Sequence, residues 1–217
     1  MEPISLVLWD WNGTLLDDVD VCVDCLNRLL AEHGYPQHYT LPQYRAIFGF
    51  PIEDYYVRAG FDFSRHSFAE LARRYMELYI PGAEVCCAAD GAREVLEQFR
   101  RSGRRQVILS ASPVGTLQRQ VSHLSLDGYF DELLGLGDIY GKSKVDMARG
   151  WMARSGLAPA AGVMIGDSLH DAEVAAAIGV RCILCAAGHQ TRAALESAGC
   201  PVVDSLREIP ALVEKGW

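Results

Sequence analysis

Short apolar segments recur along the chain between longer stretches of helical periodicity. Four of them, at residues 4–9, 106–109, 162–165 and 182–184, are almost continuously hydrophobic. Runs of this length without alternation are typical of strands that are buried on both faces of a parallel sheet. A further short strand is expected at residues 201–203. The pattern predicts an α/β fold with a Rossmann-like parallel sheet covered by helices.

The intervals between the apolar runs carry helix signals. Apolar positions in residues 92–99 repeat at the spacing i, i+3, i+4, i+7, which places them on one face of a helix. Ser143 and Asp146 fit a capping box, with the acidic residue three positions after the serine. Ser112 followed by Pro113 fits a helix cap with proline in the first turn. These signals place helices between successive strands.

The first two apolar runs are separated by far more than one helix. Residues 16–84 contain two apolar stripes at helical spacing, and prolines punctuate the segment. A connection of this length is better explained as an inserted unit than as a loop. We expect residues 1–15 and 85–217 to form the domain that contains the sheet, and residues 16–84 to form a helical domain inserted into it.

Polar side chains suited to catalysis follow three of the predicted strands. Asp10 follows the first strand, Ser110 the second and Asp167 the third. Ligands of open parallel sheets bind outside the carboxyl ends of the strands, so these three residues are expected to converge. Polar residues also end strands without any catalytic role, so each of the three is a weak signal when taken alone.

The sequences around two of these residues suggest specific chemistry. Asp10 is followed by Asn12 and Gly13, a pair that favours a tight turn beside the carboxylate. Asp167 and Asp171 lie four residues apart, at a strand end and on the first turn of a helix. This spacing suits the oxygen ligands of Mg²⁺. Helix capping by aspartate is the alternative explanation for the second pair.

Lysine is rare, and its placement is informative. Of the 20 lysines and arginines only three are lysines, namely Lys142, Lys144 and Lys215. The first two lie at the start of a predicted helix, where an ammonium group could neutralise both a carboxylate and a phosphoryl group. Lys144 follows Ser143 in the first turn, from which a side chain can point back towards the strand ends, so we prefer it. A solvated surface pair is the alternative, and the spacing permits either lysine.

The overall composition excludes some partners. The net charge is −8, whereas a nucleic-acid partner requires a basic surface that neutralises phosphates. A small phosphorylated substrate remains compatible with this charge, because a few local cations and a metal can bind it. No apolar run has the length needed to span a bilayer, so no membrane partner is expected. The first residues do not resemble a signal peptide, and a cytoplasmic location is the default expectation.

The cysteines offer a competing hypothesis. The seven cysteines include two C-x-x-C pairs, Cys22 with Cys25 and Cys182 with Cys185, and four thiolates can bind zinc. However, the second pair lies in a predicted strand, where residues three apart point to opposite faces. The first pair lies on the apolar stripe of a predicted helix, where cysteine behaves as a small hydrophobic residue. We therefore interpret the cysteines as structural residues in a reducing compartment.

Taken together, the motifs resemble those of the haloacid dehalogenase superfamily. Residues 10–15 are similar to its first motif, DxDGT[LV], and Ser110 is similar to its second, a serine or threonine after a strand. Lys142 or Lys144 corresponds to the third motif, and residues 166–171 to the fourth, GDSxxD. The resemblance covers essentially the whole chain, with the insertion between the first two motifs similar to the helical cap of the phosphoglycolate phosphatase-like branch.

The resemblance implies a Mg²⁺-dependent phosphatase in which Asp10 attacks phosphorus and forms an aspartyl-phosphate. It also implies that Mg²⁺ is held by Asp10, Asp167 and the backbone carbonyl of Asn12. Asp171 would bind the metal or position its water ligands. The residues expected to bind the phosphoryl group of the substrate are Ser110, Ala111, Lys144 or Lys142, and the backbone N–H groups around Trp11 and Gly13.

One residue departs from the pattern. In phosphatases of this superfamily the position of Asn12 is normally an aspartate, which protonates the leaving oxygen and then deprotonates the attacking water. An amide does neither, and general acid–base catalysis is worth about a hundred- to ten-thousand-fold in rate. One interpretation is a phosphatase that favours good leaving groups or recruits another acid, for which the candidates are Asp17, Asp18, His170 and His189. If the missing acid limits the rate, Asn12→Asp is expected to raise it.

Other functions are compatible with an amide at this position. Phosphonatases of the superfamily use a cap lysine, but residues 16–84 contain no lysine. Dehalogenases need no metal, so retention of Asp167 and Asp171 disfavours that reaction. A weakly active or inactive phosphate-binding regulatory module is the main alternative from a different class. The substrate stays open, although three arginines of the insertion could bind a carboxylate or second phosphate of a metabolite such as phosphoglycolate: Arg45, Arg58 and Arg65.

Overall fold

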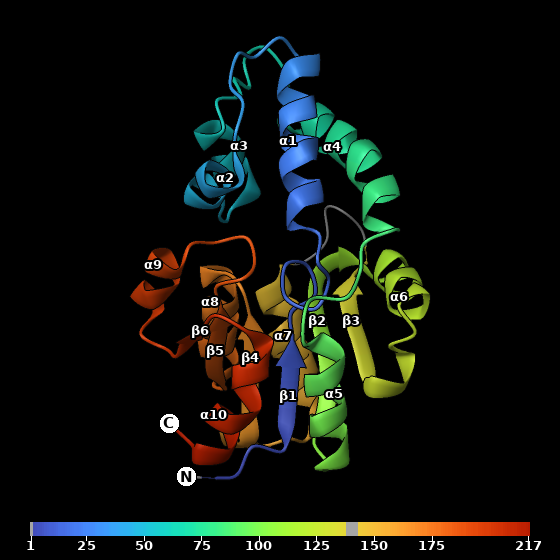
Figure 1. Cartoon of the computed structure of the whole chain (residues 1–217), viewed down its shortest axis with the longest axis vertical. Helices are drawn as coiled ribbons and strands as arrows, with labels where there is room; N and C mark the ends of the chain where they lie inside the picture. The colour runs from blue at the N-terminus through green and yellow to red at the C-terminus, as the bar shows by residue number, and fades with distance from the viewer. Residues whose placement is uncertain (1, 138–142) are drawn as a thin grey trace.

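The computed structural model describes residues 2–137 and 143–217, and within them six strands form one parallel sheet (Figure 1). The strand order is β3-β2-β1-β4-β5-β6, so β1 lies between β2 and β4. This order confirms the predicted α/β fold with a Rossmann-like sheet. The strands are β1 (Leu6–Trp9), β2 (Arg105–Pro113), β3 (Glu132–Leu136), β4 (Gly162–Gly166), β5 (Arg181–Cys185) and β6 (Val202–Val203).

Helices connect the strands and cover the sheet. None of the helices in the described residues is both long and apolar enough to cross a bilayer. The helices inserted between β1 and β2 are α1 (Val19–Glu32), α2 (Leu41–Ile47), α3 (Ile52–Arg58) and α4 (Phe68–Ala83), and they are followed by α5 (Ala92–Arg101). The remaining helices are α6 (Val114–His123), α7 (Lys144–Ser155), α8 (Leu169–Ile178), α9 (Arg192–Leu195) and α10 (Ile209–Lys215).

The side chains of β1 show why both faces of the sheet are covered. All four are buried, as expected for a strand with a continuous apolar sequence. Val7 and Trp9 pack with α5, α6 and α10, whereas Leu6 and Leu8 pack with α7 and α8. Because successive residues of a strand face opposite sides, β1 contributes to the apolar layers on both sides of the sheet.

The end of β2 differs from the predicted arrangement. The strand continues to Pro113 and α6 begins at Val114, so the expected helix cap at Ser112 is wrong. The strand is prolonged because it pairs with β3, a partly buried edge strand that the hydrophobic pattern did not indicate. The serine half of the predicted capping box at α7 is confirmed, since the Ser143 hydroxyl accepts a hydrogen bond from the Asp146 N–H at 3.2 Å. The Asp146 carboxylate accepts from the Ser143 hydroxyl at 3.0 Å and makes no bond to the Ser143 N–H in the described structure, so the reciprocal half is wrong.

The helices inserted between β1 and β2 have an apolar cluster of their own. α1 and α4 pack against each other, and their buried side chains join those of α2 and α3. We call α1–α4 the cap, because these helices lie over the carboxyl ends of the strands (Figure 1). The domain boundaries after residues 15 and 84 stay a prediction, but the cap covers the edge of the sheet at which the candidate residues were expected.

The cysteines lie in separate apolar layers. Cys182 packs on one face of the sheet and Cys185 on the other, as their spacing predicts. Cys22 and Cys25 belong to the apolar cluster of the cap. All seven cysteines lie in the described part of the chain and are free. Their packing supports the interpretation of the C-x-x-C pairs as buried hydrophobic residues.

Candidate active site

The order of the strands determines where a ligand can bind. The chain moves from β1 towards β2 and β3 on one side, and β4, β5 and β6 lie on the other. Such a reversal leaves a crevice outside the carboxyl ends of the two central strands. Asp10 follows β1 and Asp167 follows β4, and the Asp10 N–H donates to the Ile165 carbonyl at 2.8 Å. The two aspartates are therefore placed side by side at the switch point of the sheet.

Asp10 is almost completely buried and makes two side-chain contacts with polar partners. Its Oδ1 accepts a hydrogen bond from Lys144 Nζ at 2.5 Å, and its Oδ2 accepts one from the Thr14 hydroxyl at 3.2 Å. Burial raises the pKa of Asp10 to about 7, although the charge of Lys144 opposes the change. The charges of Asp171 and Asp167 raise the pKa further. The carboxylate is thus held in a site where negative charge is only partly compensated.

Asp167 and Asp171 complete a cluster of acidic side chains. Asp167 Oδ2 accepts a hydrogen bond from the His189 N–H at 2.5 Å, and burial raises its pKa to about 6. Asp171 Oδ2 accepts bonds from the Ser168 N–H and hydroxyl, at 3.1 and 2.7 Å. Burial raises the pKa of Asp171, but Lys144 outweighs it, so the pKa lies below its ordinary value. The carboxylates therefore differ in how well the protein neutralises them.

Lys144, in the first turn of α7, forms ion pairs with two of these carboxylates. Its ammonium group donates to Asp10 Oδ1 and to Asp171 Oδ1, at 2.5 and 2.6 Å. Only 4% of the residue is exposed. Burial lowers the pKa of Lys144, but the two carboxylates outweigh this effect and raise it. Of the two lysines weighed from the sequence, the structure places Lys144 on the nucleophile candidate, whereas Lys142 lies outside the described residues.

The donor set fits a divalent cation. Oxygen atoms of Asp10, Asp167 and Asp171 lie within 4.8 Å of one another, and all three residues are buried. Lys144 contacts two of the three carboxylates, and burial is the main reason why the pKa of Asp10 is raised to about 7 and that of Asp167 to about 6, with the neighbouring carboxylates adding to it. Mg²⁺ prefers carboxylate and carbonyl oxygens, so it could supply the missing positive charge. The backbone around the cluster is correspondingly tight, because a Cβ at Gly188 would lie 2.1 Å from Asp167 Oδ2.

The structure brings Ser110 and Ala111 to the same edge of the sheet. Both belong to β2, which pairs with β1 up to the register of Trp9 with Ile108. Ser110 is fully buried, and its hydroxyl accepts a hydrogen bond from the Ser112 N–H at 3.0 Å. Ala111 lines a cavity together with Asp10 and Lys144. Their role in binding a phosphoryl group stays a prediction.

The loop after β1 is fixed by its own backbone. The Trp11 carbonyl accepts the N–H groups of Leu15 and Leu16, both at 2.9 Å, and the Trp11 side chain is buried. Gly13 has a φ of +72°, a conformation that favours glycine. The Gly13 N–H donates to Asp18 Oδ1 at 2.8 Å. In this structure that hydrogen bond occupies one of the N–H groups that were expected to face the phosphoryl group.

The Asn12 side chain belongs to a network that the sequence did not indicate. Its Nδ2 donates to Asp18 Oδ2 at 2.9 Å and to the Tyr79 hydroxyl at 2.7 Å. Its Oδ1 accepts a hydrogen bond from the Ser112 hydroxyl at 2.8 Å. Asp18 and Tyr79 come from the cap helices, at the start of α1 and near the end of α4. Apart from Asn12 itself, the sequence pointed to one member of this network only, Asp18, which was one of four candidates for an alternative acid.

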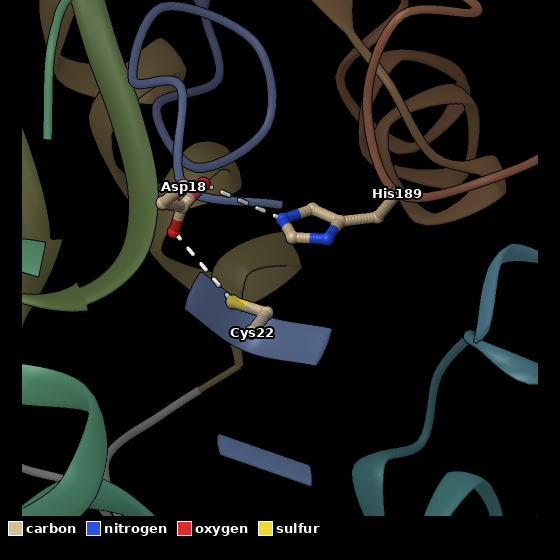
Figure 2. A group of neighbouring side chains, drawn as sticks. All are labelled: Asp18, Cys22 and His189. Carbon is tan, nitrogen blue, oxygen red and sulfur yellow. Dashed lines mark hydrogen bonds and ion pairs between the residues drawn. The ribbon is translucent and has the colours of Figure 1, made fainter. Parts of the chain in front are cut away.

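Asp18 also lies between two other buried side chains, as Figure 2 shows. His189 Nε2 faces its Oδ1 at 3.6 Å, and Cys22 Sγ faces its Oδ2 at 3.8 Å. The three could in principle hold a metal, since their ligand atoms lie within 4.8 Å. However, both Asp18 oxygens already accept shorter hydrogen bonds from the loop and from Tyr79. These hydrogen bonds explain the cluster without an ion.

The cap contacts the sheet domain beside this network. The Tyr44 hydroxyl forms a hydrogen bond with His189 Nδ1 at 2.9 Å. Arg45 donates to the carbonyls of Gly188 and Ala187, at 2.8 and 2.5 Å. The ring of Phe48 stacks on His189, with 4.7 Å between the ring centres. α2 and the turn after it therefore hold the loop that follows β5.

A small cavity lies at the junction of the cap and the acidic cluster. Its volume is about 80 Å³, far below the roughly 300–1,000 Å³ of most ligand pockets. A larger hollow of about 580 Å³ lies between α1 and α4, but none of the candidate site residues lines it. The small cavity is lined by Asp10, Asn12, Phe48, Phe50, Ala111, Lys144, Asp167, Ser168, His170 and His189. In this arrangement of the cap the cavity is too small for a substrate much larger than a phosphate group.

A parallel sheet with acidic side chains and a buried lysine at its switch point is the arrangement of an α/β enzyme with its site at the carboxyl ends of the strands. The chain belongs to the haloacid dehalogenase-like hydrolase family, whose pattern matches residues 7–185. It is 28% identical to the phosphoglycolate phosphatase of Pseudomonas savastanoi pv. phaseolicola, over 94% of this chain and 78% of that protein. It is also 28% identical to the phosphoglycolate phosphatase of Nitrosospira multiformis, over 98% and 97% of the two chains.

A solved structure has a similar fold. The crystal structure of a predicted phosphatase from Clostridium acetobutylicum matches with a TM-score of 0.85 and 21% identity, covering 99% of this chain and 100% of that chain. At this identity the likeness shows the fold alone. The comparisons confirm the family and the class of enzyme that the motifs predicted, a hydrolase of the haloacid dehalogenase superfamily whose similar relatives are named as phosphatases.

Proposed function

We propose that this protein is a Mg²⁺-dependent phosphatase that hydrolyses a small phosphorylated metabolite through an aspartyl-phosphate on Asp10. The observation that supports it best is the buried Lys144 ammonium group, which donates to both Asp10 and Asp171 at the switch point of the sheet. The names of the similar relatives support the same reaction. A cytoplasmic location, where free cysteines persist, belongs to the same proposal.

In this mechanism Asp10 supplies the nucleophilic oxygen. Attack on phosphorus forms an acyl phosphate and breaks the bond to the leaving oxygen, and water then attacks phosphorus, releases phosphate and restores the carboxylate. Lys144 orients Asp10 and offsets the negative charge of the approaching phosphoryl group. The Thr14 hydroxyl bridges Asp10 Oδ2 and Asp167 Oδ1, at 3.2 and 3.3 Å, and so fixes the position of the two carboxylates.

Asp10, Asp167 and Asp171 would hold the Mg²⁺ ion, with the backbone carbonyl of Asn12 as a further ligand. When bound, the ion would neutralise charge on the phosphoryl oxygens and on the carboxylates. The fit rests on three buried carboxylates whose oxygens lie within 4.8 Å of one another; burial, together with the neighbouring carboxylates, raises the pKa of Asp10 to about 7 and that of Asp167 to about 6. Direct titration of the protein with Mg²⁺ tests this part separately from activity.

The reaction is tested with a chromogenic aryl phosphate and Mg²⁺. The wild type should release the phenol, and Asp10→Asn should abolish release while the protein stays folded. Asp20→Asn is a matched control, because Asp20 is an exposed carboxylate on α1 and should leave the rate unchanged. Equal activity of Asp10→Asn and wild type would contradict the proposed nucleophile.

The part of the substrate that carries the phosphoryl group can be identified by measuring turnover of a panel of phosphate monoesters. Phosphoglycolate is included because similar relatives carry that name. The three cap arginines considered as substrate ligands have other partners: Arg45 binds carbonyls of the loop after β5, Arg58 binds the Ile47 carbonyl, and Arg65 lies over the ring of Tyr35. Among the described residues that line the small cavity, the cap contributes Phe48 and Phe50. The panel should therefore include esters with uncharged leaving groups.

A phosphate-binding regulatory module is the second candidate function. The observation that favours it is the amide at position 12, whose nitrogen and oxygen are both engaged with neighbouring side chains. Such a site binds phosphate without an acid–base group at that position. Inorganic phosphate that binds in calorimetry, combined with no turnover of any ester in the panel, would favour the module over the phosphatase.

A further inference from the structure

We propose that Asp18 is a positioning residue for Asn12, and that the two form an amide–carboxylate pair in which the amide faces the site and the carboxylate lies behind it. The inference deepens the proposed phosphatase function and rests on it for its activity readout. Asn12 lines the small cavity, and Asp18 acts on the site by fixing the orientation of Asn12.

The first observation is the orientation of the Asp18 side chain. Asp18 is the residue before the first turn of α1, where an aspartate normally accepts an N–H of the helix. Within the described structure its carboxylate makes no such capping bond. It is 1% exposed and turned towards the loop after β1. A buried carboxylate that gives up a helix cap is held there by other interactions.

The second observation is that the loop and the cap supply those interactions. Asp18 Oδ1 accepts the Gly13 N–H at 2.8 Å. Its Oδ2 accepts Asn12 Nδ2 at 2.9 Å and the Tyr79 hydroxyl at 2.6 Å. The Tyr79 hydroxyl in turn accepts from Asn12 Nδ2 at 2.7 Å. His189 Nε2 faces Asp18 Oδ1 at 3.6 Å, as Figure 2 shows, so both oxygens of the carboxylate have polar neighbours.

The third observation is that the donors and acceptors allow only one orientation of the amide. The nitrogen of Asn12 faces the acceptors Asp18 and Tyr79, and its oxygen faces the Ser112 hydroxyl at 2.8 Å. A rotation of the amide would place an oxygen against the Asp18 carboxylate and lose the hydrogen bond between them. The network thus fixes which atom of Asn12 is presented at each side.

An aspartate at position 12 would not fit this network. It would place a carboxylate oxygen where Asn12 Nδ2 now donates, 2.9 Å from a buried oxygen of Asp18. Two carboxylates buried at that distance repel each other while both are ionised, so the pair carries an electrostatic cost that the amide–carboxylate pair does not. Asn12→Asp is therefore expected to lower the activity, in contrast to the rise expected when the residue is considered without its neighbours. Exchanging both residues restores one amide and one carboxylate.

The test is a double-mutant cycle of Asn12→Asp and Asp18→Asn, measured with an aryl phosphate and in thermal unfolding. Each single variant should lose roughly tenfold or more in kcat with a smaller change in KM, and the double variant should recover most of the loss. Asp20→Asn is the exposed control and should match the wild type. Tyr79→Phe should lower kcat less than Asp18→Asn, because the direct bond from Asn12 to Asp18 remains.

Two results would overturn the inference. One is an Asn12→Asp variant as active as the wild type or more active. The other is a double variant no better than the worse single variant, in both kcat and the unfolding midpoint. If the wild type hydrolyses no ester, the proposed function fails, and the cycle in thermal unfolding still tests the pair. Additive midpoints would then contradict the inference, whereas a midpoint recovered in the double variant would support it.

Discussion

Replacement of Lys144 by methionine tests the electrostatics of the site most sharply. Methionine keeps much of the length of the side chain and removes the charge that is 2.5 Å from Asp10 and 2.6 Å from Asp171. All three residues are buried. Removing one partner of a buried ion pair costs about 3–5 kcal/mol, because the other partner is left without compensation. For a chain of this length each kcal/mol lowers the unfolding midpoint by about 2–4 °C.

The expected loss is therefore roughly 6–20 °C for Lys144→Met in the absence of metal. Its pH dependence follows from Asp10, whose folded-state pKa is already raised to about 7 and would rise further without the lysine. A carboxyl with a raised folded-state pKa contributes stability that is present at low pH and is lost as the pH rises through that pKa. The difference from wild type should thus be larger at about pH 8 than at about pH 5.5.

The assay is thermal unfolding with a chelator, repeated with Mg²⁺ and accompanied by the aryl phosphate rate. Mg²⁺ should recover part of the lost midpoint, whereas turnover should fall by about a hundredfold or more. Lys215→Met is the matched control, because Lys215 is exposed on α10. A Lys144→Met midpoint within about 2 °C of the wild type at about pH 8 would contradict a strong ion pair at this site, because the loss of stability would then be below about 1 kcal/mol.

Three further predictions concern the metal, the loop and the cap. The affinity for Mg²⁺ should rise from about pH 5 to pH 7.5, because binding displaces protons from Asp10 and Asp167, whose pKa values are about 7 and about 6. Calorimetry that finds the same affinity across this pH range would contradict the prediction. Gly188→Ala should weaken Mg²⁺ binding and lower the free energy of unfolding by about 1–3 kcal/mol, because the new Cβ would lie 2.1 Å from Asp167 Oδ2. Gly128→Ala is the control: its Cβ would meet no atom within 4 Å, so it should be neutral in the same assays. Arg45→Met removes two hydrogen bonds from α2 to the loop after β5, so it should raise KM for the aryl phosphate more than it lowers kcat; an unchanged KM would show that this contact does not help the cap to close.

The sequence predicts those strands of the sheet that are continuous apolar runs. β1 and β4 are continuous apolar runs, and each is followed at once by an aspartate, so strand and candidate residue are read together. β3 was missed because it is an edge strand with partly buried residues and a glycine, and its pairing with β2 is a tertiary event. The same pairing extends β2 past Ser112, which overrides the local signal for a helix cap.

The candidate site was predictable to the extent that it depends on residues near the strand ends. Lys144 could be preferred because a side chain in the first turn of a helix points back towards the strands. The role that we propose for Asp18 could not be predicted in this way, because it depends on where the cap helices place Tyr79 and on the orientation of the Asn12 amide. The sequence alone leads to a rate rise in Asn12→Asp if the missing acid limits the rate, whereas the hydrogen bonds of Asn12 and Asp18 lead us to propose a fall.

Single-turnover and steady-state kinetics with an aryl phosphate show whether Asp10 becomes phosphorylated. A good leaving group needs little help from an acid, so Asp10 should be phosphorylated quickly, while the step that activates water is slow beside the amide of Asn12. The account predicts a burst of phenol equal to the amount of enzyme, and acid-quenched protein should carry phosphate on the peptide that contains Asp10. Turnover without a burst, and with no phosphate on that peptide, would contradict it.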